Sequence, residues 1–346
     1  MKSWKTMKSK KIRVVFGIIV LFICGGMIYL VSRRDDSATT IPQYVFTYAE
    51  NQPEDYPTTQ GAYHFAGLVE ERTNGRIKIN VHAGAKLGDE VSVIEQVQFG
   101  GIDFARASIM TMSETVPALN VLQLPYLYDT SEKMWNILDG EIGQEFMSYL
   151  DDYGMKALSW YDAGARHFYT SKKEITRLED LAGLRIRVAD SELMYDLVTA
   201  LGAIPVRLPY SEVYSALETS QIDGAENNCS SYEKMGHYTV AKYITLDGHN
   251  QIPELQVVSS ATWNKLSKED QNIILECAIE SAKYQRLLWT KQEDASKTTI
   301  VGAGCIVTEL TGSEIKKIKE ALMPLYDKFG GEYANLIQRI KDAQVD

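Results

Sequence analysis

Leu-Arg-Ile-Arg-Val at residues 184–188 is followed by Asp-Gly-Ala-Glu-Asn-Asn at residues 223–228, and these two segments are the most informative part of the chain. Arg185 and Arg187 alternate with apolar residues, which predicts a strand. The Asp-Gly pair predicts a turn that delivers side-chain amides to the rim of a cleft. Because arginine offers a planar fork of donors and keeps its charge when water is expelled, we expect this region to bind an anion.

A third arginine, Arg166, opens the run Arg-His-Phe-Tyr about one strand and one connection earlier. Two neighbouring strands are therefore expected to project Arg166 and Arg187 into one cleft. A single strand arginine more often lies on a solvated face, so each one alone says little. The pattern does not choose Arg187 over Arg185, because both lie on the same face of the strand.

Strand-like and helix-like patterns alternate along the 346 residues, a length sufficient for two domains. The order of these elements predicts α/β lobes with a mainly parallel sheet, whose ligand site lies beyond the carboxyl ends of the strands. Glu50, Asn51 and Arg106 fall at such strand ends. The patterns predict strands at residues 43–49, 76–81, 102–107, 155–161, 184–188 and 204–208, and helices at 58–72, 89–99, 191–201 and 211–219.

A long helix is predicted to begin after Ser267, which is followed three residues later by Asp270, as in a capped helix start. The helical pattern runs towards Thr298. A helix of about 30 residues extends about 45 Å, which is long enough to bridge two lobes. The alternative is a helix confined to one lobe.

The N-terminal segment is predicted to interact with a membrane. Residues 14–31 are apolar apart from glycines and one tyrosine, and six Lys and Arg residues precede them. This charge distribution predicts that the bulk of the chain is extracytoplasmic. The segment is long for a signal-peptide core and short for a membrane span. We favour an uncleaved anchor over a lipoprotein attached at Cys24, because bulky Ile23 precedes the cysteine.

The charge of the remaining chain argues against nucleic-acid binding. The first 34 residues hold eight Lys and Arg and no acid, so the remainder carries 28 basic against 46 acidic residues. Such a surface repels nucleic acid. The sequence contains no G-x-S-x-G, H-E-x-x-H or glycine-rich phosphate loop, and its histidines lack metal-ligand spacing. We therefore predict no catalytic residue, no metal and no cofactor.

Three cysteines lie outside the N-terminal segment: Cys229, Cys277 and Cys305. Their odd number and spacing indicate neither a disulfide framework nor a zinc site. Cys277 falls within a helical pattern of apolar residues, so we predict that it packs in the core.

Ordered motifs cover nearly everything after residue 40. They include Leu-Pro-Tyr-Leu-Tyr at 124–128, Gly-Leu-Arg-Ile-Arg-Val at 183–188, Ser-Glu-Val-Tyr-Ser-Ala-Leu at 211–217 and Asp-Gly-Ala-Glu-Asn at 223–227. With these motifs the chain resembles the solute-binding proteins of tripartite ATP-independent periplasmic (TRAP) transporters. The resemblance implies a two-lobed α/β, periplasmic-binding-protein-like (Venus flytrap) fold, with hinge strands and a long lobe-bridging helix, that closes on a small organic acid.

On this interpretation the chain divides into an N-terminal segment and two lobes. The N-terminal segment and linker cover residues 1–40. Lobe I takes residues 41–164 plus roughly 254–292, and lobe II takes residues 165–253 plus roughly 293–346.

The resemblance also implies roles for individual residues. The family arginine that matches Arg187 makes a bidentate salt bridge to the ligand carboxylate, and the one that matches Arg166 lies close by. The amide that matches Asn227 bonds the ligand. Tyr210 falls where an aromatic residue contacts the ligand.

Other stretches are similar to the branch of the family that binds hexuronates such as glucuronate or galacturonate. These stretches are residues 103–108, 160–166, 245–249 and 253–254. A sugar acid needs one carboxylate clamp and several hydrogen-bond acceptors for its hydroxyls. The ligand site is therefore predicted to include Glu50, Asp247, His249, Glu254 and Asn227. Cys229 departs from this branch, in which a large aromatic residue usually follows the paired asparagines.

Alternatives remain at several of these positions. Arg106 is either a second anchor, which would suit a C4-dicarboxylate, or a structural arginine paired with Glu50 or Glu226. Asp247, His249 and Glu254 are either ligand contacts or hydrogen-bonding residues at the hinge and lobe edges, and Tyr210 is either a ligand contact or a helix-capping core residue. An aldonate or a sialate is a further alternative ligand.

Three classes of function compete. A transport binding protein, which we favour, would bind an organic acid reversibly, leave it unchanged and dock on the membrane subunits of a TRAP transporter. An exported uronate-acting enzyme would need an acid and a base placed across the ligand, and no carboxylate pair in the sequence suggests this. A ligand sensor would need a signalling domain, which the short N-terminus does not contain.

Overall fold

A computed structural model of the protein describes residues 41–345. The predicted membrane segment at residues 14–31 and the candidate lipidation site at Cys24 lie outside the described residues. Between residues 41 and 345, no helix combines the length and the apolar character needed to cross a membrane.

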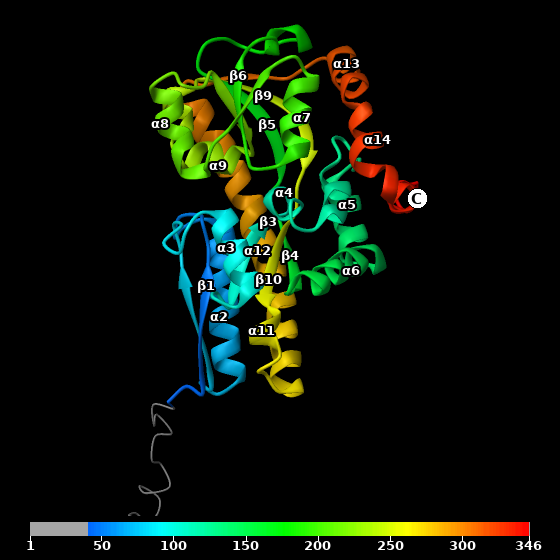
Figure 1. Cartoon of the computed structure of the whole chain (residues 1–346). Coiled ribbons are helices and arrows are strands. Elements are labelled where there is room, and N and C mark those ends of the chain that lie inside the picture. Colours follow the sequence, from blue (N-terminus) through cyan, green and yellow to red (C-terminus); the bar gives the residue numbers. More distant parts are fainter. Residues whose placement is uncertain (1–40, 346) are drawn as a thin grey trace, which may run out of the picture. The chain divides into compact units, whose positions relative to one another are not determined.

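The first of two β-sheets organises one lobe (Figure 1). Its five strands follow the order β2-β1-β3-β10-β4. β1 pairs in parallel with β2 and β3, but β10 runs antiparallel between β3 and β4. The strands are β1 (Tyr44–Ala49), β2 (Ile77–His82), β3 (Phe104–Ser108), β4 (Met155–Tyr161) and β10 (Glu254–Ser259). The expected mainly parallel sheet is therefore wrong for this lobe, because β10 enters from the other lobe and not through a crossover helix.

The second sheet organises the other lobe and contains six strands in the order β11-β9-β5-β8-β6-β7. β6 runs parallel to both β7 and β8, whereas β5 runs antiparallel to β8 and β9. The strands are β5 (Ala165–Thr170), β6 (Arg185–Val188), β7 (Ile204–Arg207), β8 (Gly224–Asn227), β9 (Tyr243–Gln251) and β11 (Ile306–Thr308). The carboxyl ends of β6, β7 and β8 thus meet at one edge of the sheet.

The chain passes between the two lobes at three places before its C-terminal helices. The chain passes from β4 to β5 through residues 162–164, returns from β9 to β10 through residues 252–253, and crosses again within α12 (Lys268–Gly302), which has 35 residues. The Ser267 side chain accepts a hydrogen bond from the N–H of Asp270 and caps this helix, as predicted. α12 packs against α2 in the first lobe and α9 in the second. The predicted fold of two α/β lobes, hinge strands and a bridging helix is confirmed.

Helices cover both sheets (Figure 1). The longer helices of the first lobe are α2 (Pro57–Arg72), α3 (Glu90–Phe99), α5 (Ser131–Leu138) and α6 (Glu141–Ser148), with the short α4 (Ile109–Met112) and α11 (Ser260–Trp263). The second lobe carries α7 (Glu192–Ala200), α8 (Val213–Glu218), α9 (Cys229–Lys234) and α10 (His237–Val240). The chain ends with α13 (Gly312–Leu322), α14 (Pro324–Gly330) and α15 (Ala334–Asp342). α13 packs on α7 and α15 packs on α6, so this final segment contacts both lobes. The lobe limits given above remain a prediction.

Two details of the packing bear on the sequence analysis. Cys277 is fully buried among apolar side chains between α2 and the first sheet, as predicted. The Asp223-Gly224 pair does not form the predicted turn, because Gly224 is already the first residue of β8. A Cβ atom at Gly224 would lie 2.4 Å from the carbonyl oxygen of Tyr169, so glycine is needed here for the close approach of β5 and β8.

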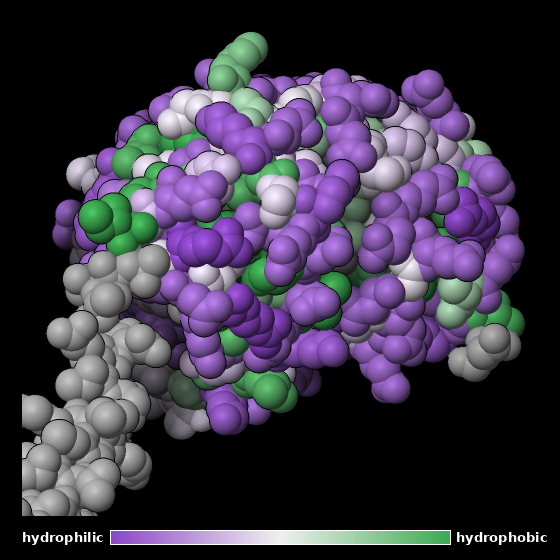
Figure 2. Space-filling view, turned by 90° about the horizontal axis from the view of Figure 1, so that it is seen from below, coloured by the Kyte–Doolittle hydropathy of each residue, from purple (hydrophilic) through white to green (hydrophobic). Residues whose placement is uncertain are grey.

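The face of the molecule shown in Figure 2 is largely hydrophilic. On the described part of that face, apolar side chains form small separate groups. This agrees with the acidic balance of the chain outside its first 34 residues.

Candidate functional site

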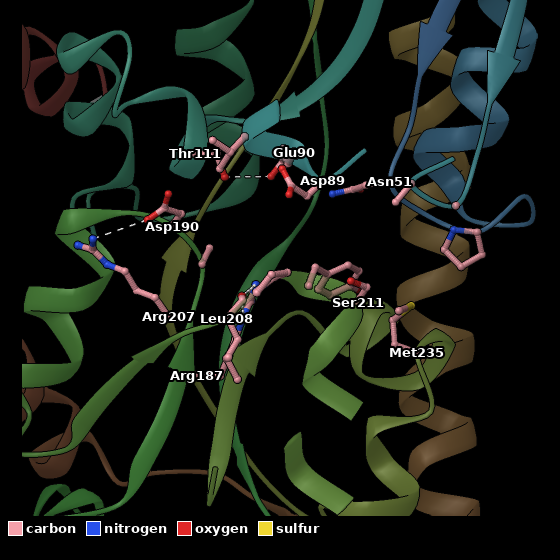
Figure 3. Close-up of a pocket in the computed structure, with 17 residues that line it drawn as sticks. Asn51, Asp89, Glu90, Thr111, Arg187, Asp190, Arg207, Leu208, Ser211 and Met235 are labelled. Atoms are coloured by element: carbon pink, nitrogen blue, oxygen red, sulfur yellow. Dashed lines mark hydrogen bonds and ion pairs between the residues drawn. The ribbon is translucent and has the colours of Figure 1, made fainter. Parts of the chain in front are cut away.

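A cavity of about 500 Å³ lies between the two lobes. Asn51, Asp89, Glu90 and Thr111 lie on its first-lobe side, and Arg187, Leu208 and Ser211 face them from the second lobe (Figure 3). A smaller recess of about 50 Å³ adds Arg106, Glu254, Arg166 and Asn227 to the lining. Asn51, Glu90, Arg187 and Tyr210 line both spaces, which therefore adjoin.

Arg187 lies near the carboxyl end of β6 and is 5% exposed. Its Nε and Nη2 atoms donate hydrogen bonds to the carbonyl oxygen of Leu208 at 3.0 and 2.8 Å. Within residues 41–345 no carboxylate forms an ion pair with it, and burial lowers the pKa of the guanidinium. An arginine has five N–H groups, so three remain available, including a pair at the end of the fork. Arg187 is thus a buried cation prepared for an anion.

Arg185 lies on the same strand but has a different environment. It pairs with Asp223 through Nε and Nη2 and its side chain is 37% exposed. The structure therefore separates the two arginines that the alternating pattern left equivalent. Arg207, which also lines the cavity, has acidic partners too, Asp190 and Glu192.

Arg166 on β5 reaches the same recess but is already neutralised. The strands of Arg166 and Arg187 are not neighbours as expected, because β8 lies between them and brings Glu226 against Arg166. Both carboxylate oxygens and the backbone oxygen of Glu226 accept hydrogen bonds from Arg166, and Oδ1 of Asn227 accepts another at 3.0 Å. One N–H of Arg166 remains available.

Asp247 and His249 lie behind this pair and not among the residues that line the two spaces. His249 Nδ1 lies 2.8 Å from Asp247 Oδ2, and its Nε2 lies 3.6 Å from Glu226 Oε2. Burial lowers the pKa of His249, but the two carboxylates outweigh burial and raise it to about 9. The imidazolium therefore links Asp247 on β9 to Glu226 on β8.

Arg106 on β3 occupies the opposite wall and has no free donor. Nε and Nη2 donate to Glu50, Nη1 donates to Glu90 at 3.0 Å and Glu254 at 3.1 Å, and Nη2 also donates to Asn51. These five bonds use all five N–H groups of the side chain. Arg106 is thus bound by three acids, and Glu50 is one of the partners that the structural alternative named.

Several buried acceptors on the lining remain unused. Oε2 of Glu50 and Oε2 of Glu254 are buried and have no hydrogen-bond partner among residues 41–345. Burial raises the pKa of Glu254, and although Arg106 lowers it, the repulsion of Glu90 and Glu50 helps to bring it to about 7. In the same described part of the chain, the buried hydroxyl of Tyr210 also lacks a partner. The Tyr210 ring lies 5.9 Å from the guanidinium of Arg187.

Seven of the nine predicted residues line the cavities. Glu50 lines a small separate space beside Arg106 and not the two larger ones. These seven are Arg187, Arg166, Asn227, Tyr210, Arg106, Glu50 and Glu254. Glu90 was not predicted from the sequence, although a helix beginning beside the carboxyl end of a strand was a usable signal. Asn51 was predicted only as a strand-end residue. The predicted roles of all nine residues stay predictions.

One group outside the cavity has spacing compatible with a metal ion. Ligand atoms of His167, Cys229 and Glu293 all lie within 4.8 Å of one another. His167 Nδ1 accepts the N–H of Gly248 at 3.0 Å, and burial lowers the pKa of its ring to about 4. The neutral ring therefore carries its proton on Nε2, which disfavours metal ligation through that nitrogen.

The cleft has the form of a site that receives a small solute between two hinged lobes. Residues 48–332 match the family described as bacterial extracellular solute-binding protein, family 7, and the chain belongs to this family. A solute-binding protein of Chromohalobacter salexigens is 38% identical over 292 residues, which are 84% of this chain and 86% of that protein. The predicted membership of the TRAP solute-binding proteins, a periplasmic family, is confirmed.

Solved structures of TRAP periplasmic solute-binding proteins superimpose on the chain. The protein of Xanthobacter autotrophicus Py2, with bound β-D-galacturonate, is 36% identical with a TM-score of 0.84, covering 86% of this chain and 100% of that one. The protein of Pseudomonas putida F1, with bound D-glucuronate, is also 36% identical with a TM-score of 0.84, and the coverage is 87% and 98%.

Proposed function

We propose that this protein captures a hexuronate, such as glucuronate or galacturonate, outside the cytoplasm and delivers it to the membrane subunits of a TRAP transporter. The observation that carries the proposal is Arg187, a buried cation in the cleft without an acidic partner among residues 41–345. The sugar acids bound by the similar proteins of X. autotrophicus and P. putida support this choice of ligand.

The ligand carboxylate meets the free end of the Arg187 fork. The remaining N–H of Arg166 and the amide of Asn227 add donors from the same lobe, and Tyr210 contributes its ring and hydroxyl. The sugar hydroxyls then face acceptors on the other lobe, including Glu90 and Glu254. Contacts on both lobes favour the closed arrangement when the ligand is present.

The remaining predicted site residues act through these contacts. Glu50 holds Arg106, which in turn fixes the acceptors of the first-lobe wall. Asp247 and His249 hold Glu226, which orients Arg166. These residues position the ligand-binding groups and do not touch the sugar acid.

The protein releases its ligand unchanged, and its residues 14–31 anchor the protein itself at the membrane. The arrangement of the acids supports the first point, because Glu50, Glu90 and Glu254 all contact one arginine and are not placed as a separate acid and base. Prolonged incubation with glucuronate followed by chromatography should return the sugar acid intact. Appearance of a product would replace the transport proposal with an enzymatic one.

Calorimetric titration of Arg187 variants with glucuronate and galacturonate tests the ligand assignment. Charge-assisted hydrogen bonds contribute about 1.5–3 kcal/mol each, so Arg187→Ala should weaken binding by about 100-fold or more. Arg187→Lys should recover little, because lysine does not reproduce the bidentate geometry. Arg185→Ala is the matched control. Arg185 lies on the same strand but is paired with Asp223, so its removal should leave the affinity unchanged. Unchanged affinity of Arg187→Ala would refute the proposal.

A further inference from the structure

The first-lobe wall of the cleft carries more negative charge than its arginine neutralises. Glu50, Glu90 and Glu254 converge on Arg106, with ion-pair distances of 2.5, 3.0 and 3.1 Å. Across residues 41–345, Arg106 is the one basic side chain that pairs with any of the three. Three carboxylates around one guanidinium leave two negative charges in excess when all of the acids are ionised.

This wall offers acceptors and no arginine donor to a ligand. All five N–H groups of Arg106 are already used, as described above. Glu254 is 8% exposed, and its Oε2 has no hydrogen-bond partner in the described chain. Glu90 faces Arg187 across the cavity (Figure 3). A ligand held by Arg187 therefore directs its far end at carboxylate oxygens.

We propose that Glu90 and Glu254, together with Glu50, form a charge filter that selects the far end of the ligand. Glu90 and Glu254 accept hydrogen bonds from hydroxyl groups of the ligand, and Glu50 adds its charge from behind. The filter rejects a second carboxylate, which would be placed beside like charges. The inference rests on the proposed capture of a sugar acid by Arg187. It specifies that the ligand carries one carboxylate and a hydroxylated opposite end.

The filter also disfavours the alternative ligand, a C4-dicarboxylate. A second carboxylate needs a donor or a cation at its own end of the cleft, and the cation available there is committed to three glutamates and Asn51. To bind it, Arg106 would have to release one of these partners, and the second carboxylate would still lie beside the charges of the three glutamates.

Two probes that share a six-carbon chain test the filter: D-glucuronate, with one carboxylate, and D-glucarate, with a carboxylate at each end. Titration calorimetry at pH 8, above the pKa of about 7 of Glu254, gives both dissociation constants for the wild-type protein. The same pair is measured for Glu254→Gln and for the double variant Glu90→Gln/Glu254→Gln. Glutamine keeps an acceptor for Arg106 and removes one charge. Comparing variants by the ratio of the two constants cancels the difference in shape between the probes.

The wild-type protein should bind glucuronate more tightly than glucarate. Each glutamine should reduce the ratio of the glucarate to the glucuronate dissociation constant by about tenfold, because it removes one like charge beside the second carboxylate of glucarate. Glu132→Gln, which removes an exposed charge from the first lobe outside the cavity lining, should leave the ratio unchanged. If the double variant does not fold, Glu254→Gln alone carries the test.

Three outcomes overturn the inference, and the last of them is distinguishable from the first two. A wild-type protein that binds glucuronate, with a ratio that stays within about twofold in the folded glutamine variants, refutes the filter alone. Equal affinity of the wild-type protein for the two acids refutes it as well. A wild-type protein that binds neither acid refutes the proposed function, and the filter with it.

Discussion

Arg187 and Arg106 line the same cleft from opposite lobes, and their environments differ in nearly every respect. Arg187 is 5% exposed and, within residues 41–345, donates only to a backbone carbonyl, while Arg106 is 3% exposed and is surrounded by three glutamates. The number of unused N–H groups separates them, three for Arg187 and none for Arg106. A buried arginine that keeps free N–H groups is therefore suited to anchor a ligand. One whose N–H groups are all bonded to acceptors of the protein is a structural centre.

Electrostatics expresses the same contrast. Burial lowers the pKa of Arg187, and Glu226 offsets this only in part. At Arg106 burial also lowers the pKa, but the attraction of Glu254, Glu50 and Glu90 outweighs it and the pKa is raised well above its usual value. The Arg187 wall of the cleft thus lacks an anionic partner for its cation, and the Arg106 wall already holds more carboxylates than its arginine neutralises.

Removing the guanidinium of Arg106 should produce the largest loss of stability. Arg106→Ala leaves Glu50 and Glu254 buried without a cation. Breaking a buried ion pair from one side costs about 3–5 kcal/mol. Urea denaturation of the ligand-free protein measures the change in unfolding free energy. A loss below about 1 kcal/mol would show that Arg106 is not the structural centre of its wall.

The second-lobe network should give stability that disappears in alkaline solution. Asp247 and Glu226 raise the pKa of His249 from 6.5 to about 9, while Arg166 pairs with Glu226 from the other side. Because the folded-state pKa is the higher one, this contribution is complete below pH 6.5 and is lost as the pH rises through 9. It amounts to about 3 kcal/mol.

Unfolding free energies measured between pH 6 and 10 test this prediction. His249→Gln should lower stability at pH 6 and flatten the decline between pH 6.5 and 9 that the wild-type protein shows. Phe65→Leu, which alters a fully buried ring in the apolar core of the first lobe, is the control, since it should lower stability equally at every pH. A decline that persists in His249→Gln would assign it to another group.

Substitution of Glu254 on the first-lobe wall should have the opposite effect to substitution of His249, because removal of the Glu254 charge stabilises the folded protein. Its pKa is raised from 4.5 to about 7, so its favourable contribution is complete below pH 4.5 and is lost as the pH rises through 7. Above pH 7 the ionised carboxylate costs stability. Glu254→Gln should therefore be more stable than wild type at pH 8 by roughly 3 kcal/mol and similar to it at pH 4.5. Thermal unfolding at the two pH values measures this, and a variant less stable at pH 8 would contradict it.

Local patterns predicted most of the fold from the sequence. The strand that carries Arg187, the helix capped by Ser267 and the two-lobed plan all follow from periodicity, capping and the matched motifs. The mixed sheets did not follow, because strand order depends on where a strand enters the sheet. Periodicity along β10 does not reveal that it returns from the other lobe.

The site required contacts between distant parts of the chain. Arg185 and Arg187 are equivalent by alternation, and the difference arises from Asp223, which pairs with Arg185 from 38 positions further along. The insertion of β8 between the two arginine strands, which neutralises Arg166 through Glu226, is likewise a matter of strand order. Residue type and spacing indicated which side chains reach the cleft, but not which of them retain free donors.

The smallest effect on stability should come from Arg187 itself. Arg187→Ala removes two hydrogen bonds to Leu208 and a contact with the Tyr210 ring, but it also removes a buried charge that has no acidic partner among residues 41–345. These changes oppose each other, so the ligand-free variant should stay within about 1 kcal/mol of wild type.

Added ligand should then stabilise the wild-type protein but not the Arg187→Ala variant. At a glucuronate concentration 100 times the dissociation constant, the wild-type protein gains about 2.7 kcal/mol, and the variant should gain almost nothing. Thermal unfolding with and without glucuronate measures both quantities in one experiment. A ligand-free Arg187→Ala protein that is destabilised as strongly as Arg106→Ala would show that Arg187 also serves the fold. The contrast between Arg187 as a ligand anchor and Arg106 as a structural residue would then be wrong.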